Sequence, residues 1–347
     1  LGDVYKRQEF RLFNNRLWGD FNYYTRDDKD QIISVTSAPQ SGYSTRKMNA
    51  GLIRNRGVEL SLGGMPVSTK NWKWEMNFNI AKNSNKLVEL ADGVDSYSIY
   101  WTSFTTRLYN YAMVGKSLGV ITGNTWERDD NGNIIFHELS ASQKALYGGE
   151  YVPTYNQNTL DELGNFHPDF TGGFNTSISF KNFRLSANID FSVGGQIVSY
   201  TNMWGSSSGI LDKTAELNDR GVNVREPVSK GGGIHMTGVD QNGNKVDTYV
   251  NAKLYYTTAS RVWEEWVYDR TYVKLREVSL SYVFPSQTLK KLNIGLSRAS
   301  VAINASNPWL IYSACPNVDV SEIGMGYFEG GNAAATRSIG FTVNLAF

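Results

Sequence analysis

The sequence predicts an all-β protein, an antiparallel transmembrane β-barrel wall of about ten strands. Two observations favour this fold class. Apolar and polar residues alternate strictly in segment after segment of the 347-residue chain, and the connections between these segments alternate between long and short. Because side chains on a strand point to opposite faces in turn, each alternating segment predicts a strand with one apolar and one polar face.

The alternation assigns individual side chains to the two faces. The apolar face, expected to meet lipid, carries Trp72, Trp74, Phe78, Phe183 and Phe191. The polar face, expected to line a lumen, carries Lys73, Glu75, Arg184 and Asp190. Polar residues on one face of a barrel indicate a water-filled or plugged interior.

The lengths of the connections place the predicted sheet in a membrane. We expect strands at 9–26, 51–66, 70–84, 106–114, 119–127, 169–180, 182–199, 271–284, 293–306 and 336–347. Short connections then fall at 66–69, 115–118, 181 and 285–292, and long ones at 27–50, 85–105, 128–168, 200–270 and 307–335. Short periplasmic turns opposite long extracellular loops are typical of outer-membrane barrels, and five long loops are uncommon in a compact soluble domain. A soluble all-β sandwich is the alternative.

Composition excludes several other classes. With 34 Lys and Arg against 33 Asp and Glu, nothing indicates a nucleic-acid surface. Cys315 is the only cysteine, so neither an internal disulfide nor a thiolate metal cluster can form. No run approaches the roughly 18 apolar residues of a membrane-spanning helix.

The sequence gives no sign of an enzyme or of a cofactor. His137, His167 and His235 lie in separate long loops without metal-ligand spacing, and no nucleophile elbow or phosphate-binding motif is present. The adjacent carboxylates Glu264 and Glu265 would face opposite ways on a strand. We therefore predict a non-enzyme with no cofactor and no metal.

The first eight residues look like the in-frame translation of a transposon adapter. They run Leu1-Gly2-Asp3-Val4-Tyr5-Lys6-Arg7-Gln8, without an initiating methionine or a signal peptide. We treat residues 1–8 as a non-native leader and residues 9–347 as the native portion, and expect the native protein to extend upstream.

Six segments in order resemble the SusC/RagA family of TonB-linked outer-membrane proteins. They are Asn49–Leu60, Trp72–Leu90, Pro168–Phe174 with Lys181–Phe183, Tyr272–Tyr282, Asn304–Pro308 and the terminal Phe347. The family usually continues Asp-Pro-Glu after the late asparagine strand, where this chain has Asn317–Glu322.

The resemblance implies the last ten or so strands of a 22-stranded barrel in the outer membrane, with an N-terminal plug that is not in this sequence. It also implies import of an oligosaccharide or peptide, a SusD-like surface lipoprotein as partner, and drive from TonB-ExbB-ExbD through the N-terminal part. A non-transporting adhesin or receptor barrel is the alternative function. An outer-membrane hydrolase would need converging Ser, His and Asp residues.

Two groups of residues are candidate sites. The loop aromatics that could stack on a substrate, or simply pack in loops, are Tyr97, Tyr100, Trp101, Trp204, Tyr255 and Tyr256. The terminal alternation of Phe341, Val343, Leu345 and Phe347 predicts the signal by which assembly machinery recognises a barrel, although any final amphipathic strand would look alike.

Two further patterns have a plainer interpretation. The segments 129–133 and 240–244 have the oxygen-rich composition of calcium loops, but lack the later glutamate, and Asn-Gly favours tight turns. For Trp263, Trp266, Tyr268 and Tyr272 we expect an aromatic girdle at the lipid interface.

Overall fold

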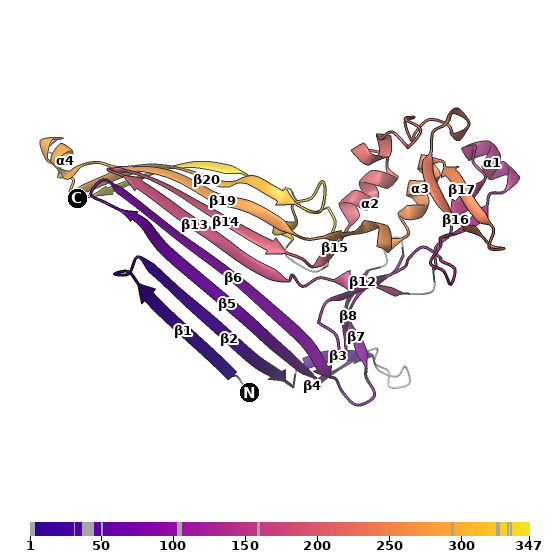
Figure 1. Cartoon of the computed structure of the whole chain (residues 1–347), viewed down its shortest axis with the longest axis horizontal. Coiled ribbons are helices and arrows are strands. Elements are labelled where there is room, and N and C mark those ends of the chain that lie inside the picture. Colours follow the sequence, from indigo (N-terminus) through magenta and orange to yellow (C-terminus); the bar gives the residue numbers. More distant parts are fainter. Residues whose placement is uncertain are drawn as a thin grey trace.

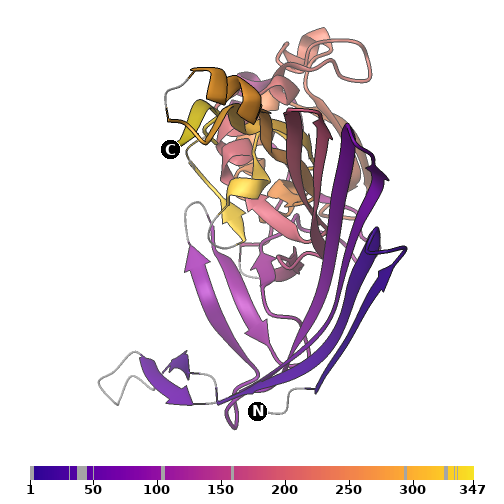
Figure 2. The same cartoon turned by 90° about the vertical axis from the view of Figure 1, so that its left-hand side faces the viewer.

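The largest element of the computed structural model is a nine-stranded antiparallel sheet, here called the wall sheet (Figure 1). The structure describes residues 4–30, 32–36, 45–49, 51–102, 106–157, 160–292, 295–323, 327–331, 333 and 335–347. In spatial order the strands are β1 (Val4–Leu12), β2 (Leu17–Lys29), β5 (Leu52–Ser68), β6 (Trp72–Glu89), β13 (Phe170–Phe180), β14 (Phe183–Val193), β19 (Tyr272–Val283), β20 (Arg298–Ser313) and β22 (Ser338–Ala346). The all-β prediction is confirmed. Figure 2 shows that the sheet is curved, as twisted strands require.

Tight turns and long connections lie at opposite ends of the wall sheet (Figure 1). Every neighbouring pair of strands is antiparallel and consecutive in this order, so connections alternate between the two ends. Short turns join β1 to β2, β5 to β6, and β13 to β14, and helix α4 (Ser286–Leu292) lies between β19 and β20 at the same end. The predicted asymmetry of the loops is confirmed.

The long connections contain the remaining elements. Three smaller sheets are β11 (Tyr151–Pro153), β10 (Ile135–Glu138), β16 (Ile234–Asp240) and β17 (Lys245–Val250); β12 (Asp161–Asn165), β9 (Val120–Gly123), β8 (Leu108–Met113) and β7 (Ser96–Thr102); and β18 (Val267–Asp269), β15 (Gln196–Ser199) and β21 (Phe328–Glu329). A further hairpin joins β3 (Ile32–Thr36) to β4 (Thr45–Asn49). The helices are α1 (Ala141–Tyr147), α2 (Tyr200–Ser207), α3 (Ala252–Ala259), η2 (Asp212–Ala215), η3 (Val228–Lys230), η4 (Trp263–Trp266) and η5 (Val320–Glu322). Within the described ranges, no helix is long and apolar enough to cross a membrane.

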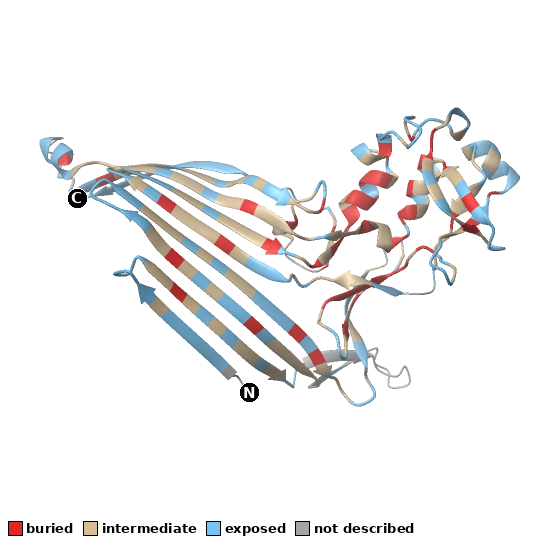
Figure 3. Cartoon of the chain, viewed as in Figure 1, coloured by how far each residue is buried: buried red, intermediate tan, exposed pale blue. Residues whose placement is uncertain are grey.

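Three of the long connections fold together into one body, here called the cap: the described residues of 90–169, 194–271 and 314–331. Its hydrophobic core takes Ile121 and Trp126 from the first connection, Trp263 and Trp266 from the second, and Tyr327 from the third. Buried residues gather in the cap, whereas the wall sheet is mostly half-buried and exposed (Figure 3). The cap therefore has a buried apolar core of the kind that stabilises a globular protein, whereas the wall sheet keeps large apolar side chains exposed.

The assignment of 106–114 and 119–127 to the barrel wall is wrong. These residues form β8 and β9, which belong to a cap sheet and not to the wall sheet. The short connection expected at 115–118 therefore lies in the cap and not with the tight turns of the wall sheet. All four residues of β9 are buried, and every second residue of β8 is buried. Strands of six and four residues are also shorter than the roughly 9–11 residues that a membrane-spanning strand needs.

Other predicted boundaries need correction. The single strand expected at 9–26 is a hairpin, because residues 13–15 adopt positive φ and turn the chain between β1 and β2. The strand expected at 182–199 ends at Val193, since Gly194 and Gly195 both have φ of 77° and redirect the chain into cap strand β15. The strand expected at 293–306 begins at Arg298 and continues to Ser313, while residues 293–294 lie outside the described residues.

Candidate functional site: a two-faced wall sheet and its cap

One face of the wall sheet, the apolar face, carries side chains aligned in rows across the strands. Strand pairing places Trp72, Phe180, Phe183 and Tyr282 in one aromatic row near the tight turns. The rings of Trp72 and Phe180 lie 4.3 Å apart, and those of Phe183 and Tyr282 lie 4.7 Å apart. An aromatic row at the end of an apolar band has the form of the aromatic girdle of a membrane barrel.

The next row across the apolar face is aliphatic for most of its length. It consists of Trp74, Ile178, Leu185, Leu280, Ile303 and Phe341. Leu280 is 48% exposed and Ile303 is 54% exposed. Exposed apolar patches of this extent mark contact with another protein or with a membrane.

The apolar band is as long, measured along the strand, as a membrane-spanning strand requires. Phe191 lies toward the other end of β14 and stacks against Phe78, with ring centroids 6.1 Å apart. At about 3.3 Å per residue, about 26 Å of strand separates Phe183 from Phe191. These nine residues match the roughly 9–11 that a tilted membrane-spanning strand needs.

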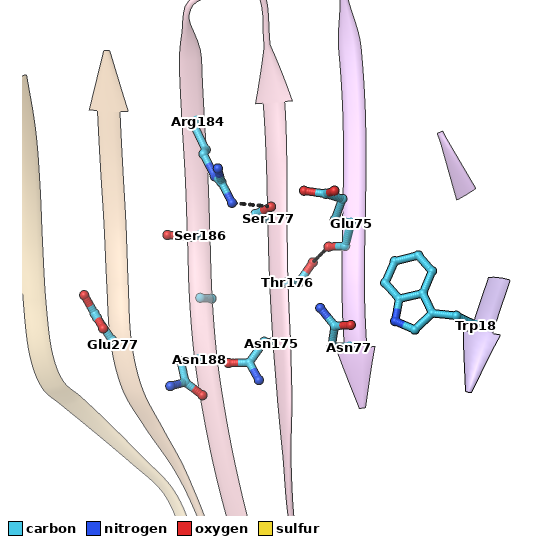
Figure 4. Close-up of a pocket in the computed structure, with 11 residues that line it drawn as sticks. Trp18, Glu75, Asn77, Asn175, Thr176, Ser177, Arg184, Ser186, Asn188 and Glu277 are labelled. Carbon is cyan, nitrogen blue, oxygen red and sulfur yellow. Dashed lines mark hydrogen bonds between the residues drawn. The ribbon is translucent and has the colours of Figure 1, made fainter. Parts of the chain in front are cut away.

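The opposite face, the polar face, holds an open hollow of about 360 Å³ (Figure 4). Its lining includes the charged side chains of Glu75, Arg184 and Glu277, with amides and hydroxyls between them. Arg184 donates from Nη2 to Ser177 Oγ at 3.2 Å. The predicted separation of Glu75 and Arg184 from Trp72 and Phe183 on opposite faces is confirmed.

A β-bulge at Arg276 concentrates charge on the polar face. The pairing of β19 with both neighbouring strands shifts between Leu275 and Glu277. A bulge inserts one extra residue and changes which side chains face each side. Lys274 and Arg276 contact the polar groups of one face, and Glu277 lines the hollow on that same face.

The structure separates the six candidate loop aromatics into exposed and buried groups. Tyr100, Trp101 and Trp204 are 45%, 57% and 42% exposed, and Tyr97 is half-buried. Tyr256 is in the cap core, and its hydroxyl donates to the Lys213 carbonyl at 3.0 Å. Burial raises the pKa of Tyr256 to about 12.

Tyr255 also packs in the cap, with its hydroxyl donating to Glu265 Oε2 at 3.2 Å. Burial is the main cause that raises the pKa of this phenol, and the nearby Glu265 adds to it. Neither Tyr255 nor Tyr256 presents a free ring face, so the exposed aromatics are the better candidates for contact with a ligand.

Two half-buried tyrosines that sequence reasoning missed continue the aromatic stack from Trp101. Trp101 on β7 stacks against Tyr109 on β8 at 6.3 Å, and Tyr109 stacks against Tyr111 at 5.3 Å. The other face of β8, which includes Leu108, is buried. The alternation of 108–113 marked both tyrosines as one face of a strand, but that strand was assigned to the wall.

The girdle predicted from Trp263 and Trp266 is wrong. Both side chains are fully buried in the cap core, and the Trp266 indole donates to the Ala259 carbonyl at 2.7 Å. Tyr268 packs against a second buried cluster, and burial raises its pKa to about 12. The Tyr272 hydroxyl donates to Asp190 on the polar face.

Glu264 and Glu265 do not face opposite ways on a strand, because both lie in η4. Glu264 pairs with Arg128, with Nη2 and Oε1 2.7 Å apart. Glu265 accepts a hydrogen bond from the Trp126 indole at 2.6 Å. Both carboxylates therefore join two connections of the cap.

The two oxygen-rich segments form turns closed by their own aspartates. Asp129 Oδ1 accepts from the backbone N–H groups of Asn131 and Asn133 at 3.0 and 2.8 Å, and Gly132 has φ of 85°. Asp240 makes the equivalent bonds within residues 240–244. Among the described side chains, no group of three His, Cys, Asp or Glu is arranged to hold a metal ion.

The three histidines lie in different environments. His235 bonds to Asp219 at 2.8 Å and to Asp247 at 2.7 Å, whereas His137 lies 3.2 Å from the Gln241 amide. His167 is exposed, but partial desolvation of its ring, followed by the charge of Arg270, lowers its pKa.

Known proteins similar to the chain are TonB-dependent receptors. TonB-dependent receptor P3 of Formosa agariphila is 28% identical over 316 residues, covering 89% of this chain and 29% of the relative. TonB-dependent receptor SusC of Bacteroides thetaiotaomicron is 30% identical over 198 residues, 54% of this chain and 19% of the relative. The RagAB peptide importer in its closed-closed state matches 99% of this chain with a TM-score of 0.70 and 19% identity. The chain is SusC/RagA-like.

This SusC/RagA-like chain spans about a third of the length of the relatives it matches. No family model matches it. The structural likeness shows the fold, an all-β barrel wall, and the sequence likeness shows that its relatives are receptors of the TonB-dependent kind.

In the SusC/RagA-like fold, the predicted assembly-signal residues lie along the last strand. Phe341, Val343 and Leu345 are on β22, and they are 67%, 51% and 54% exposed. Phe341 is directly opposite Ile303 and therefore belongs to the apolar face. Phe347 follows the strand and is 85% exposed. Their role in assembly stays a prediction.

Proposed function

We propose that the protein carrying this chain imports a large nutrient, an oligosaccharide or a peptide, across the outer membrane in a TonB-dependent manner. The observation that carries the proposal is the two-faced wall sheet. An apolar band about 26 Å long, measured along the strand, suits lipid, while the reverse face is polar and hollowed. Closed barrels can cross a bilayer because strand pairing satisfies the backbone polar groups.

The relatives support transport over simple adhesion. They are named TonB-dependent receptors, and one solved neighbour is named a peptide importer. We therefore propose TonB-ExbB-ExbD as the energy source, acting through a part outside this chain. A SusD-like surface lipoprotein is the proposed partner at the cap.

The proposed substrate contacts are aromatic rings of the cap. Of the six candidates, Tyr100, Trp101 and Trp204 are the most exposed residues, and Tyr109 and Tyr111 continue the stack from Trp101. Flat apolar rings with polar edges suit both sugar rings and peptide side chains. The wall sheet would supply the rigid support from which the cap is held.

Uptake by living cells tests the proposal. The gene is deleted from its host, and accumulation of fluorescently labelled oligosaccharides and peptides is compared with that of cells complemented by the full-length gene. We expect accumulation to be lost in the deletion strain and in a complemented strain that lacks TonB. Surface binding that persists without any TonB-dependent accumulation would favour the adhesin alternative, and cleavage of the label would favour a hydrolase.

We also propose that residues 1–8 are not native. Val4–Gln8 form the first part of β1, which pairs with β2. Pairing of backbone groups requires no particular side chains, so the geometry is compatible with either origin. Sequencing upstream of Glu9 in the source DNA tests this: a native codon series for residues 1–8 continuing in frame would contradict it.

A further inference from the structure

Residues 314–323 and 327–331 are the part of the cap that follows β20, here called the strap, and they connect the end of the wall sheet to the rest of the cap. The strap follows β20, crosses to the polar face through η5, and ends in β21. There it pairs in parallel with β15, where Val198 is opposite Phe328 and Ser199 is opposite Glu329. The strap therefore has one end on the wall sheet and the other end on the cap.

The wall end of the strap is fixed by a buried charge. Lys274 of β19 is only 1% exposed, and its ammonium donates to Asp319 Oδ2 at 2.7 Å and to Glu322 Oε1 at 2.6 Å. It also donates to Ser321 Oγ at 3.1 Å. A buried ammonium without partners is strongly unfavourable, so Lys274 holds this geometry only while the strap is seated.

A second cation shares the same contact and remains open to the polar face. Arg276 pairs with Glu322 through Nη1, and its Nε donates to Asp190 Oδ1 at 2.9 Å. The side chains of Arg276 and Asp190 are 26% and 31% exposed. This ion pair is therefore partly accessible to solvent, unlike Lys274.

The cap end of the strap is fixed to the first turn of α2. Glu329 is 2% exposed, and its carboxylate accepts from Ser199 Oγ at 2.8 Å and from the Thr201 hydroxyl. Asn317 Nδ2 donates to Asn202 Oδ1 at 2.9 Å. Ser199 is also the N-cap of α2, accepting from the Asn202 backbone N–H at 3.1 Å.

We propose that the strap couples the polar face of the wall sheet to helix α2 of the cap. The ion pairs of Asp319 and Glu322 with Lys274 fix the strap on the wall sheet. Glu329 of the strap in turn binds Ser199 and Thr201 at the start of α2. A carboxylate on the polar face that pairs with Arg276 in place of Glu322 loosens the strap and, through it, α2. By linkage, loosening α2 must weaken the wall contact in return. The proposal rests on contacts within this chain and does not depend on transport.

Hydrogen exchange of the full-length receptor in detergent tests the coupling in one direction. Lys274→Met removes the ammonium and keeps most of the side-chain volume. We expect backbone exchange in α2, residues 200–207, to become at least about tenfold faster, which corresponds to about 1.4 kcal/mol. The matched control is Lys73→Met, which removes another polar-face lysine whose 2.7 Å partner is Glu75 on the same strand. It should leave α2 unchanged.

The reverse direction uses the cap end. Glu329→Gln removes the charge that Ser199 and Thr201 bind, and we expect faster exchange at η5, residues 320–322. If Lys274→Met prevents folding, Glu322→Gln replaces it, since Lys274 then keeps Asp319. Faster exchange of the strap without any change in α2, or an equal change in α2 with Lys73→Met, would overturn the coupling.

Discussion

Trp18 on β2 lies directly opposite Gly63 on β5, and its indole occupies the space that a Cβ on Gly63 would fill. The same cross-strand relationship recurs for Phe10 with Gly19, Tyr24 with Gly57, and Phe191 with Gly172. A glycine weakens a strand because it has no side chain to pack. An aromatic ring laid over it restores the lost contact and fixes the register of the two strands.

Gly63→Ala should therefore destabilise the wall sheet. The new methyl group collides with the indole of Trp18, which must leave its place over β5, at a cost of about 1–3 kcal/mol. The control is Gly64→Ala on the next residue, where a Cβ would meet nothing closer than 3.8 Å. Denaturant unfolding midpoints of the receptor in detergent check this, and equal midpoints for the two variants would contradict it.

An arginine introduced on the apolar face should destabilise the folded barrel far more than an arginine introduced at the next residue, which lies on the polar face. Leu185 is 46% exposed on the apolar face, whereas its neighbour Ser186 lines the polar hollow. Leu185 lies one row inside the aromatic row, so if the apolar face meets lipid, Leu185→Arg costs a part of the about 2–4 kcal/mol that an arginine costs at the bilayer midplane. Ser186→Arg enters a hollow that already holds Glu75 and Glu277.

The two substitutions are made in the full-length receptor, and each variant is folded into lipid vesicles. The gel shift of folded barrel protein then gives the folded fraction of each variant. We expect Leu185→Arg to reduce the folded fraction strongly and Ser186→Arg to change it little. Equal tolerance of the two substitutions would mean that the apolar face does not contact lipid.

The wall sheet was predictable from the sequence because its two faces meet different surroundings. Leu185 and Leu280 stay exposed on one face, and Arg184 and Ser281 share the other, so alternation survives along each strand. The bulge at Arg276 can also be recognised in the sequence, because Arg276 and Glu277 are adjacent polar residues that interrupt the alternation.

The cap could not be predicted in the same way. Its contacts join residues far apart in the chain, such as Trp126 with Glu265, and no local pattern encodes such pairs. Burial on both sides of β9 also removes the polar face that identifies a wall strand, so Val120 and Ile121 were assigned to the barrel. Strand length was the better guide there.

Acid should loosen the wall end of the strap. For Asp319, burial would raise the pKa, but hydrogen bonds from Lys274 and Ser321 outweigh burial and lower it below 3.8. The hydrogen bond from Lys274 is the main cause that lowers the pKa of Glu322 below 4.5. A carboxyl group with a lowered pKa in the folded state stabilises it above its ordinary pKa, and this contribution is lost as pH falls through the lowered value.

We expect exchange of residues 314–323, corrected for its intrinsic pH dependence, to stay constant from about pH 7 to about pH 5 and to rise below about pH 4. Asp319→Asn should make exchange faster at neutral pH and reduce the further rise in acid. Loosening of the strap as pH rises from about 5 to about 8 would have the wrong sign for these two carboxylates.

Removing an exposed cap aromatic should weaken substrate binding without unfolding the cap. Trp101 is 57% exposed and is the end ring of the stack that continues through Tyr109 to Tyr111. A stacking contact contributes about 0.5–1.5 kcal/mol, so Trp101→Ala should weaken binding of the transported nutrient about 2- to 10-fold.

Leu146→Ala on α1 is the control, because Leu146 is 72% exposed and apolar but lies outside the aromatic stack. Calorimetric titration of the full-length receptor with the nutrient identified by uptake measures both affinities, with cap integrity monitored by exchange of buried Trp263. A loss of affinity in Leu146→Ala as large as in Trp101→Ala, or unchanged affinity in Trp101→Ala, would remove the aromatic stack from the substrate site.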